Sequence, residues 1–539
     1  MKLALTILIT ITNLFTFSQS KTGVSPVWQS DNGDGTYQNP VLYADYSDPD
    51  AIRVGDDYYL IASSFNKVPG IPILHSKDLV NWRLIGYALN KLVPYNQFKT
   101  VQHGNGVWAP AIRFHNNEFY IYYPDPDFGI YLVKSKSING PWSEPLLVQE
   151  GKGLIDPCPF WDDNGKAYLV HAYAGSRAGI KSILVIKEMN AVGDQIAGNG
   201  QIVYDGHKDD PTIEGPKMYK RNGYYYLFAP AGGVSTGWQT VLRSKTVFGP
   251  YERRVVMDQG NSSVNGPHQG AWVTTPKGEN WFLHFQDKGA YGRIVHLQPM
   301  AWENDWPVIG SYKGGAIKGE PVDRYKKPAV ISKTEKAGLP DSDEFNSRSI
   351  GLQWQWQANP EPWWQFMTGT ALRLYANPVS DSANNKWLLP SLLLQKIPAP
   401  EFQVITKMQF HLSKEGEQAG LILFGTDYFH ISAEKRSNGL YISFNSCINA
   451  INGNKEQSLE LLKAEQETIY FKMVMTEGAK CRFGYSIDGS NYKMVEGFFQ
   501  AKPGKWVGAS IGLFCNSVKK TNDAGYVDID WFRFEPIAG

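Results

Sequence analysis

The sequence predicts an all-β protein in which a five-bladed β-propeller is followed by a β-sandwich. Short strands rich in Tyr, Phe and Trp recur at intervals of roughly 50–60 residues through the first 310 residues. A second, turn-like phrase recurs downstream of three of these strands. Long amphipathic helical patterns are missing from this region, which weighs against a (β/α)8 barrel of similar length.

Each recurring strand follows a turn signal such as Asn-Gly or Asn-Asn. The strands span residues 57–61, 118–122, 167–171, 224–228 and 281–285. The downstream phrase opens with Ser-Lys and closes on an aromatic ring, at residues 76–82, 135–142 and 244–251. Repeats of this length with several short strands per copy are typical of propeller blades. Five copies predict five blades, whose innermost strands converge on one channel mouth.

The flanking segments predict the remaining organisation. Residues 1–20 place one basic residue before an apolar run, which predicts a cleaved signal peptide and an exported, periplasmic or extracellular protein. We expect the propeller over residues 30–315 and a linker rich in Lys, Gly and Pro over residues 316–340. Alternating short strands over residues 341–539 predict a β-sandwich accessory domain.

Composition restricts the class of partner. The chain has 53 Lys and Arg against 52 Asp and Glu, and this balance argues against nucleic acid or an anionic membrane as partner. Its 29 Tyr, 26 Phe and 17 Trp favour β structure and also offer flat apolar faces for sugar rings. The four cysteines are far apart and indicate no zinc or redox site, although the three C-terminal ones leave room for one disulfide. No oligomeric state follows from the sequence.

Three acidic residues stand at similar distances before three of the recurring strands. Asp48, Asp156 and Glu214 lie about ten residues before the strands that begin at 57, 167 and 224. Equivalent positions in three repeats predict equivalent depths around one axis, where neighbouring carboxyl groups raise one another's pKa. A paired acid and base is what glycosidic hydrolysis requires. The alternative is three unrelated turn residues. The nearby Asp45 and Asp50 have no counterparts in the other repeats and are interpreted as turn or rim residues.

A series of short motifs follows in order across roughly residues 39–310. They are Asn39-Pro40, Ser47-Asp48-Pro49, Asp57-Tyr58-Tyr59-Leu60, Ser63-Ser64-Phe65, Pro69-Gly70-Ile71-Pro72-Ile73, His75-Ser76-Lys77-Asp78-Leu79, Val107-Trp108-Ala109-Pro110, Ile213-Glu214-Gly215-Pro216-Lys217-Met218-Tyr219, Ala231-Gly232-Gly233, Pro267-His268-Gln269-Gly270, Tyr291-Gly292-Arg293 and Trp306-Pro307-Val308. In these motifs the chain resembles glycoside hydrolase family 43. The tail resembles the concanavalin-A-like, jelly-roll sandwich of the β-xylosidase branch of that family.

The resemblance implies an inverting glycosidase with three acidic roles. Asp48 would be the general base that activates water, and Glu214 the general acid that protonates the leaving oxygen. Asp156 would raise the pKa of the acid and hold it in position. No cofactor is implied.

The resemblance also assigns softer roles around these acids. Arg293 would bind sugar hydroxyls, with a surface ion pair as the alternative. Phe65 and Trp108 would form walls of the sugar pocket, with core packing as the alternative. His268 matches a histidine that touches a calcium or sodium ion on the propeller axis in relatives, with a hydrogen-bonded core histidine as the alternative. Ile155 stands where the β-xylosidase branch often has Phe, so xylose specificity does not transfer directly.

The function expected is an exo-acting hydrolase that releases a terminal pentose, β-D-xylose or α-L-arabinofuranose, from plant cell-wall polysaccharides or oligosaccharides. An endo-acting arabinanase and a non-catalytic carbohydrate-binding propeller are the alternatives. The tryptophans of the sandwich would either bind glycan or pack against its core and the propeller; these are Trp354, Trp356, Trp363 and Trp364.

Overall fold

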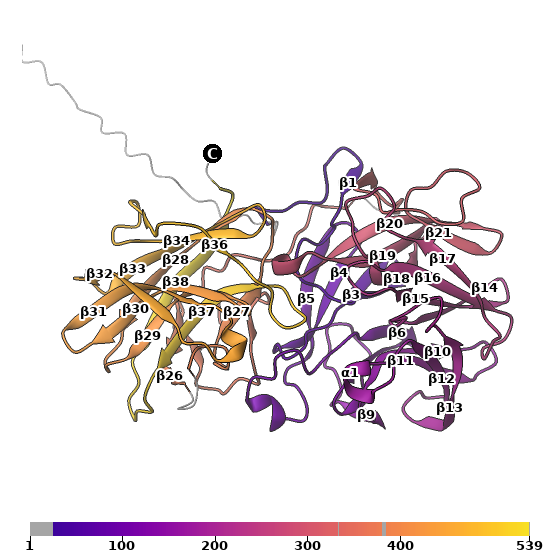
Figure 1. The fold of residues 1–539 in the computed structure, drawn as a ribbon, viewed down its shortest axis with the longest axis horizontal. Coiled ribbons are helices and arrows are strands. Elements are labelled where there is room, and N and C mark those ends of the chain that lie inside the picture. The colour runs from indigo at the N-terminus through magenta and orange to yellow at the C-terminus, as the bar shows by residue number, and fades with distance from the viewer. Residues whose placement is uncertain (1–24, 332–333, 380–383, 538–539) are drawn as a thin grey trace, which may run out of the picture.

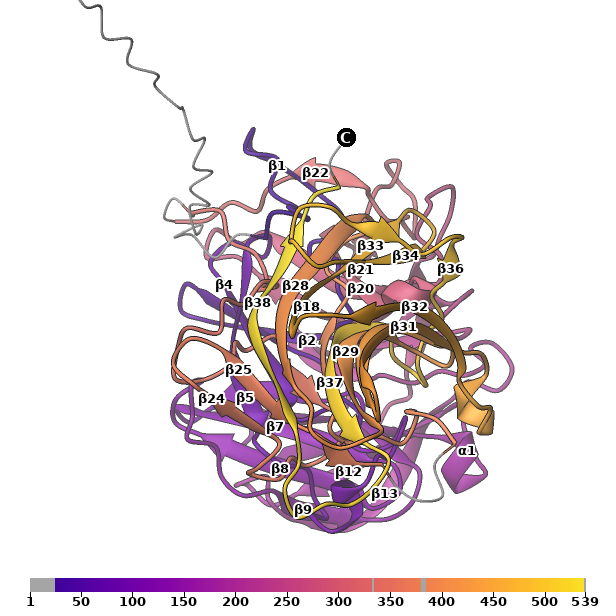
Figure 2. The same ribbon diagram turned by 90° about the vertical axis from the view of Figure 1, so that its left-hand side faces the viewer.

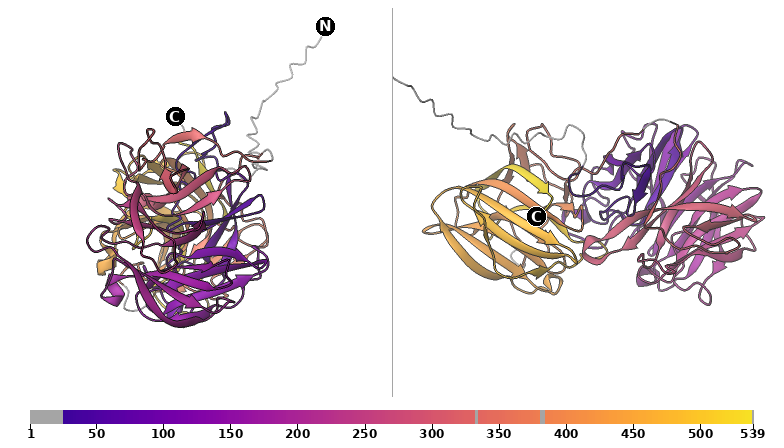
Figure 3. Two further views of the ribbon diagram at one scale, coloured as in Figure 1. Left: turned by 90° about the vertical axis from the view of Figure 1, so that its right-hand side faces the viewer. Right: turned by 90° about the horizontal axis from the view of Figure 1, so that it is seen from above.

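The computed structural model describes residues 25–331, 334–379 and 384–537, so the predicted signal peptide lies outside the described residues. Two β-rich domains lie side by side (Figure 1, Figure 3). The N-terminal domain is a five-bladed propeller and the C-terminal domain is a β-sandwich, as the sequence predicts. None of the helices in the described part of the chain is long and apolar enough to cross a bilayer.

Each blade is a four-stranded antiparallel sheet whose strands follow chain order from the axis outward. Blade 1 consists of β2 (Asp50–Val54), β3 (Asp57–Ile61), β4 (Gly70–Ser76) and β5 (Trp82–Leu89). Blade 2 consists of β6 (Ala111–His115), β7 (Glu118–Asp125), β8 (Gly129–Ser135) and β9 (Leu146–Glu150). Blade 3 consists of β10 (Leu154–Trp161), β11 (Ala167–Tyr173), β12 (Ile183–Met189) and β13 (Ile196–Asp205). Blade 4 consists of β14 (Lys217–Arg221), β15 (Tyr224–Ala231), β16 (Trp238–Ser244) and β17 (Glu252–Met257). Blade 5 consists of β18 (His268–Thr274), β19 (Asn280–Asp287), β20 (Arg293–Glu303) and β21 (Trp306–Ile309). Short helices interrupt the propeller at η1 (Gln97–Lys99), α1 (Gly175–Ala178) and η2 (Gly289–Tyr291).

The recurring aromatic strands are the second strands of the blades, β3, β7, β11, β15 and β19. They are rich in large rings because both faces of a middle strand pack against neighbouring blades. The recurring Ser-Lys phrase begins where the third strand ends. There Ser76, Ser135 and Ser244 accept backbone N–H bonds from residues two positions on, at 3.1–3.2 Å, a turn that serine hydroxyls favour.

The ring is closed by the segment that precedes blade 1. The backbone of Leu42 exchanges two hydrogen bonds with Val295 of β20, at 3.2 and 3.0 Å. Farther out, β1 (Thr36–Gln38) pairs with β22 (Arg324–Lys326), which lies inside the predicted linker. Both ends of the propeller sequence are therefore held at one place in the ring.

The sandwich consists of two packed sheets (Figure 1, Figure 2). One sheet has the order β23 (Gln355–Trp356), β27 (Leu393–Lys396), β37 (Ser510–Ser517), β29 (Glu417–Phe424), β30 (Tyr428–Arg436), β31 (Gly439–Cys447) and β32 (Gln457–Ala464), with β26 (Asn377–Pro378) parallel to β37. The other has the order β24 (Gln365–Met367), β25 (Leu372–Tyr375), β38 (Tyr526–Glu535), β28 (Phe402–His411), β33 (Thr468–Thr476), β34 (Lys480–Ser486) and β35 (Lys493–Met494), with β36 (Phe499–Gln500) beside β34. The helix η3 (Ala450–Asn452) follows β31.

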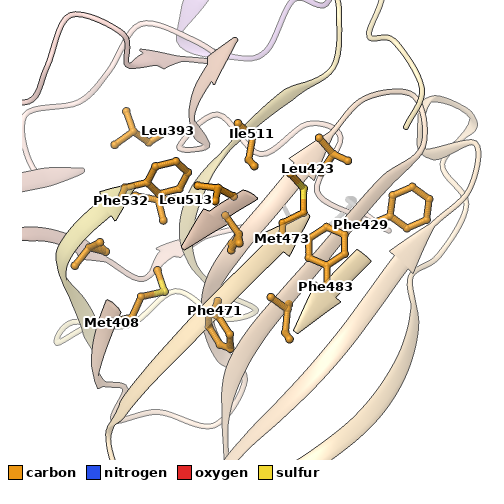
Figure 4. Packing of buried hydrophobic residues seen from close by; sticks show 14 of the residues in the cluster. Leu393, Met408, Leu423, Phe429, Phe471, Met473, Phe483, Ile511, Leu513 and Phe532 are labelled. Carbon is orange, nitrogen blue, oxygen red and sulfur yellow. The ribbon is translucent and has the colours of Figure 1, made fainter. Parts of the chain in front are cut away.

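Leucine, methionine and phenylalanine side chains from the two sheets meet in the sandwich core (Figure 4). This hydrophobic cluster continues into the propeller through Tyr43 and Tyr291. Backbone bonds also cross the boundary, because Val68 and Trp356 exchange N–H···O bonds at 3.0 and 2.7 Å. The two domains thus share both core and backbone ladder.

Three of the four sandwich tryptophans singled out in the sequence are buried, whereas Trp363 is 56% exposed. Trp354, Trp356 and Trp364 pack in the shared cluster. The interpretation of these three rings as packing residues therefore fits the structure. All four cysteines are buried as free thiols, so no disulfide forms.

Candidate active site

The three acids of the sequence analysis meet in one cavity at the axis of the propeller. Asp48 directly precedes the inner strand of blade 1, Asp156 lies in that of blade 3, and Glu214 precedes that of blade 4. All three line a cavity of about 190 Å³. Asp48 and Asp156 have φ values of 54° and 56°, in the left-handed region that is unfavourable for non-glycine residues. This backbone geometry turns both carboxyl groups out of the regular strand pattern.

Asp48 is surrounded by groups that donate hydrogen bonds to it. Its Oδ2 accepts bonds from the hydroxyls of Ser47 and Ser63, at 2.8 and 2.6 Å. Arg293 places Nη1 3.3 Å from Oδ1 and also donates to the Ser47 hydroxyl at 2.7 Å. Three donors on one carboxyl group fix its orientation in the cavity.

The surroundings of Glu214 disfavour its ionised form. Its pKa is raised, first by burial and then by repulsion from Asp156 and Asp48. The Glu214 side chain lines the cavity and is 29% exposed. The Nε2 atom of His268 lies 3.5 Å from Glu214 Oε1. A carboxyl group with a raised pKa near neutral pH is suited to donate a proton.

Asp156 interacts electrostatically with both Asp48 and Glu214. It is fully enclosed, and its Oδ2 accepts the backbone N–H of Gly215 at 2.7 Å, which fixes the residue that follows Glu214. Burial and the charge of Asp48 raise the pKa of Asp156, while the Gly215 bond and Lys217 lower it. Gly215 has φ +60°, and a Cβ there would lie 2.5 Å from the Gln269 side chain, so only glycine suits this position.

Aromatic rings form the wall of the cavity. Phe65 and Trp108 meet edge to face, with ring centroids 6.3 Å apart. Trp506, from the sandwich domain, lies 6.2 Å beyond Trp108 and completes the wall. Arg177 covers the Trp108 ring at 5.6 Å. The accessory domain therefore supplies part of the site.

The structure places Asp48, Asp156, Glu214, Arg293, Phe65 and Trp108 in the lining of this cavity. His268 is not in the lining but lies directly beside Glu214. Sequence reasoning missed Trp506 and the role of Ser47 and Ser63. The serines follow from their positions beside Asp48 and at the end of β3, whereas nothing in the local sequence marks Trp506.

The interpretation of Asp45 and Asp50 as turn or rim residues is wrong, because both are buried. Asp45 accepts the backbone N–H groups of Arg293 and Gly508, at 2.9 and 3.0 Å, and so connects the two domains. Asp50 pairs with Arg113 at 2.8 Å in the propeller core. Buried carboxylates require such partners.

The ion predicted beside His268 finds limited support in the residues present. Both ring nitrogens of His268 are buried without a partner, and burial lowers its pKa to about 3. Within the described residues, however, no group of three or more His, Cys, Asp or Glu side chains could hold a metal. Calcium prefers six to eight oxygen ligands. The surrounding side chains therefore do not form a metal centre by themselves.

A β-propeller whose cavity combines a carboxyl group held by hydroxyl donors, a second carboxyl group of raised pKa and an aromatic wall has the parts that a glycoside hydrolase requires. Residues 37–307 match the family described as "Glycosyl hydrolases family 43", and residues 342–535 match the "Beta xylosidase C-terminal Concanavalin A-like domain". The chain belongs to glycoside hydrolase family 43.

Individual relatives agree with this assignment. The chain is 38% identical to a putative beta-xylosidase of Xylanibacter ruminicola over 89% of this chain and 86% of the relative. It is 32% identical to a beta-xylosidase of Formosa agariphila over 94% and 91% of the two chains. The crystal structure of a xylan beta-1,4-xylosidase from Bacillus halodurans superposes with a TM-score of 0.81 at 25% identity, over 92% of this chain and 99% of that one.

Proposed function

We propose that this glycoside hydrolase is an inverting, exo-acting enzyme that releases a terminal pentose, β-D-xylose or α-L-arabinofuranose, from plant cell-wall polysaccharides or oligosaccharides. The observation that carries the proposal is the contrast between the surroundings of Asp48 and Glu214 in one cavity. Hydroxyl donors hold the Asp48 carboxyl group, whereas burial and two neighbouring acids raise the pKa of Glu214.

The proposed reaction is a single displacement. The Asp48 carboxylate removes a proton from a water molecule as the oxygen of that water attacks the anomeric carbon. Glu214 gives its proton to the glycosidic oxygen as the bond from that oxygen to the anomeric carbon breaks. Because attack and departure occur on opposite faces, the anomeric configuration inverts. Water restores Asp48 and Glu214 to their starting protonation states after release of the sugar.

The remaining residues of the site receive binding roles. Arg293 Nη1 lies at the cavity floor beside Asp48, where it would bind sugar hydroxyls as well as the base. Phe65 and Trp108 offer faces for sugar C–H groups. An ion near His268 stays a prediction, and no step of the reaction is assigned to it.

Exo action is favoured by the contribution of the accessory domain. Trp506 lines the cavity from the sandwich, so the space around the acids is bounded by both domains. A pocket bounded in this way accepts one chain end, whereas an endo-acting arabinanase requires an open groove. The pentose class follows from the named activities of the relatives, which include beta-xylosidases and a non-reducing end alpha-L-arabinofuranosidase of Bacteroides ovatus.

Hydrolysis of aryl β-D-xyloside and aryl α-L-arabinofuranoside tests the activity. We expect turnover of at least one, and a severe loss of turnover on natural oligosaccharides in Glu214→Gln. Glu150→Gln, an exposed residue of β9, is the matched control and should be unaffected. Unimpaired Glu214→Gln would contradict the acid role, and a first-formed sugar of retained configuration in NMR would contradict inversion.

Export is also a proposal, supported by the signal pattern of residues 1–20. Fractionation of a host that produces the full chain, with N-terminal sequencing of the exported form, tests it. An uncleaved protein in the cytoplasm would contradict it.

A further inference from the structure

A small cavity lies between the two domains and shares Phe65 with the wall of the active site. It has a volume of about 10 Å³, which is room for one water-sized particle. The propeller lines it with Asp45, Ser63, Ser64, Phe65 and Lys67, and the sandwich lines it with Gln355, Leu394, Gln395, Lys396, Val507, Ala509 and Ser510.

Two lysines line this cavity, and neither forms an ion pair with any residue that the structure describes. Lys67 is only 8% exposed, and within the described residues its ammonium group makes no hydrogen bond or ion pair. Lys396, at the end of β27, lies close enough to repel the Lys67 charge. Its own ammonium is 5.1 Å from the centre of the Tyr46 ring and has no carboxylate at ion-pair distance. Lys396 is half-buried. A cation that is largely shielded from water and lacks an ion-pair partner is costly.

A third donor lines the same space. Gln395 is 3% exposed, and its Nε2 has no hydrogen-bond partner. Buried amide groups are nearly always paired, so an unpaired one indicates a ligand or a water in the adjoining space.

Asp45, the acidic residue in the lining, offsets these charges only in part: its charge raises the pKa of both lysines, but it forms an ion pair with neither. Both carboxylate oxygens of Asp45 are already engaged, by the N–H groups of Arg293 and Gly508. With Lys67 and Lys396 charged, the lining carries two positive charges against one negative charge. The cavity therefore combines excess positive charge with unpaired donors.

We propose that this cavity binds one small monovalent anion, such as chloride, between the ammonium groups of Lys67 and Lys396, with the Gln395 amide as a further donor. The anion would join the propeller to β27 of the sandwich. It would also brace the segment of Ser63 and Phe65, which contacts Asp48 and forms the aromatic wall of the active site.

The charge state of Lys67 makes this binding depend on pH. Burial, and then repulsion by Lys396, lower the pKa of Lys67 to about 7, and Asp45 opposes this shift. The pKa of Lys396 is also lowered by burial. Of the other groups near Lys67, His103 has a pKa lowered to about 3 and is uncharged near neutrality, while Lys505 is exposed. The anion should therefore bind more tightly as the pH falls below about 7.

Thermal unfolding of the full chain tests the site when chloride replaces gluconate at constant ionic strength. Gluconate is too large for a cavity of this size. At pH 6 we expect the Tm to rise by about 1–3 °C between about 10 and 300 mM chloride, because the anion binds only the folded state. The rise should be smaller at pH 8.5. Lys67→Met and Lys396→Met should each abolish it, whereas Lys505→Met, on the same interface but outside the cavity, should keep it.

Crystals of the unaltered protein grown in bromide give a second measurement that does not depend on the folding of any variant. We expect an anomalous peak between the Lys67 and Lys396 nitrogens. The absence of an anomalous peak, together with equal Tm values in chloride and gluconate, would mean that the cavity holds only water. That result would overturn the proposal. A chloride response that persists in both lysine variants would overturn it as well.

Discussion

Replacing Asp156 by Asn should move the alkaline limb of the pH–activity profile to lower pH. In the proposed mechanism Glu214 donates a proton only while it is protonated, so activity falls as the pH rises through its pKa. Burial is the largest cause of the raised pKa of Glu214, and Asp156 is the largest contribution from a neighbouring charge. Removal of that charge lowers the pKa, and the limb follows it downward.

The size of the shift can be estimated from the repulsion removed. Two charges about 5 Å apart in a medium of effective dielectric constant about 20 repel by about 3 kcal/mol, or about 2 pH units. Because the pKa of Asp156 is itself raised, it carries only part of a full charge near neutrality, and a shift of about 1 unit is expected. The Asn side chain keeps an oxygen that can accept the Gly215 N–H, so the loop geometry should persist.

The assay is kcat/KM for an aryl glycoside measured from about pH 4 to 10, in the unaltered enzyme and in Asp156→Asn. Asp163→Asn is the matched control, because that carboxylate is 88% exposed on the same blade. An alkaline limb that stays in place, or that moves to higher pH, would refute the role of Asp156 in keeping Glu214 protonated.

Two further predictions concern the surroundings of the acids. Trp506→Ala should raise KM for short oligosaccharides by about tenfold with little change in Tm, since it removes one aromatic wall that lines the cavity; an unchanged KM would show that the sandwich does not contribute to binding. Ser63→Ala should lower kcat by about tenfold by removing the 2.6 Å donor to Asp48, with Ser143→Ala on the outer part of blade 2 as control; an effect confined to KM would contradict its action through the base.

The sequence predicted the propeller and the convergence of its acids for physical reasons. The blades repeat, and repeat phasing alone put Asp48, Asp156 and Glu214 at equivalent depths. The position of a repeat says nothing about contacts between domains, however. Trp506 comes from a loop of the sandwich with no repeat to phase it, and Asp45 was misread because its partners, Arg293 and Gly508, are far away in the chain. The interdomain cavity could not be predicted from the sequence either, because Lys67 and Lys396 come together only when the two domains pack against each other.

The closure of the ring through Leu42 and Val295 has a consequence for how the site comes into being. The proposed base, Asp48, belongs to the first blade and its guanidinium partner, Arg293, to the last, so the seam of the ring passes through the candidate active site. A nascent chain that has emerged only as far as blade 4 already contains all three acids, yet it lacks the arginine that holds the base. Such a chain should be inert until the final blade and the Trp506 loop arrive. Hydrolytic competence is thus acquired at the end of synthesis, after the scaffold around it has been built.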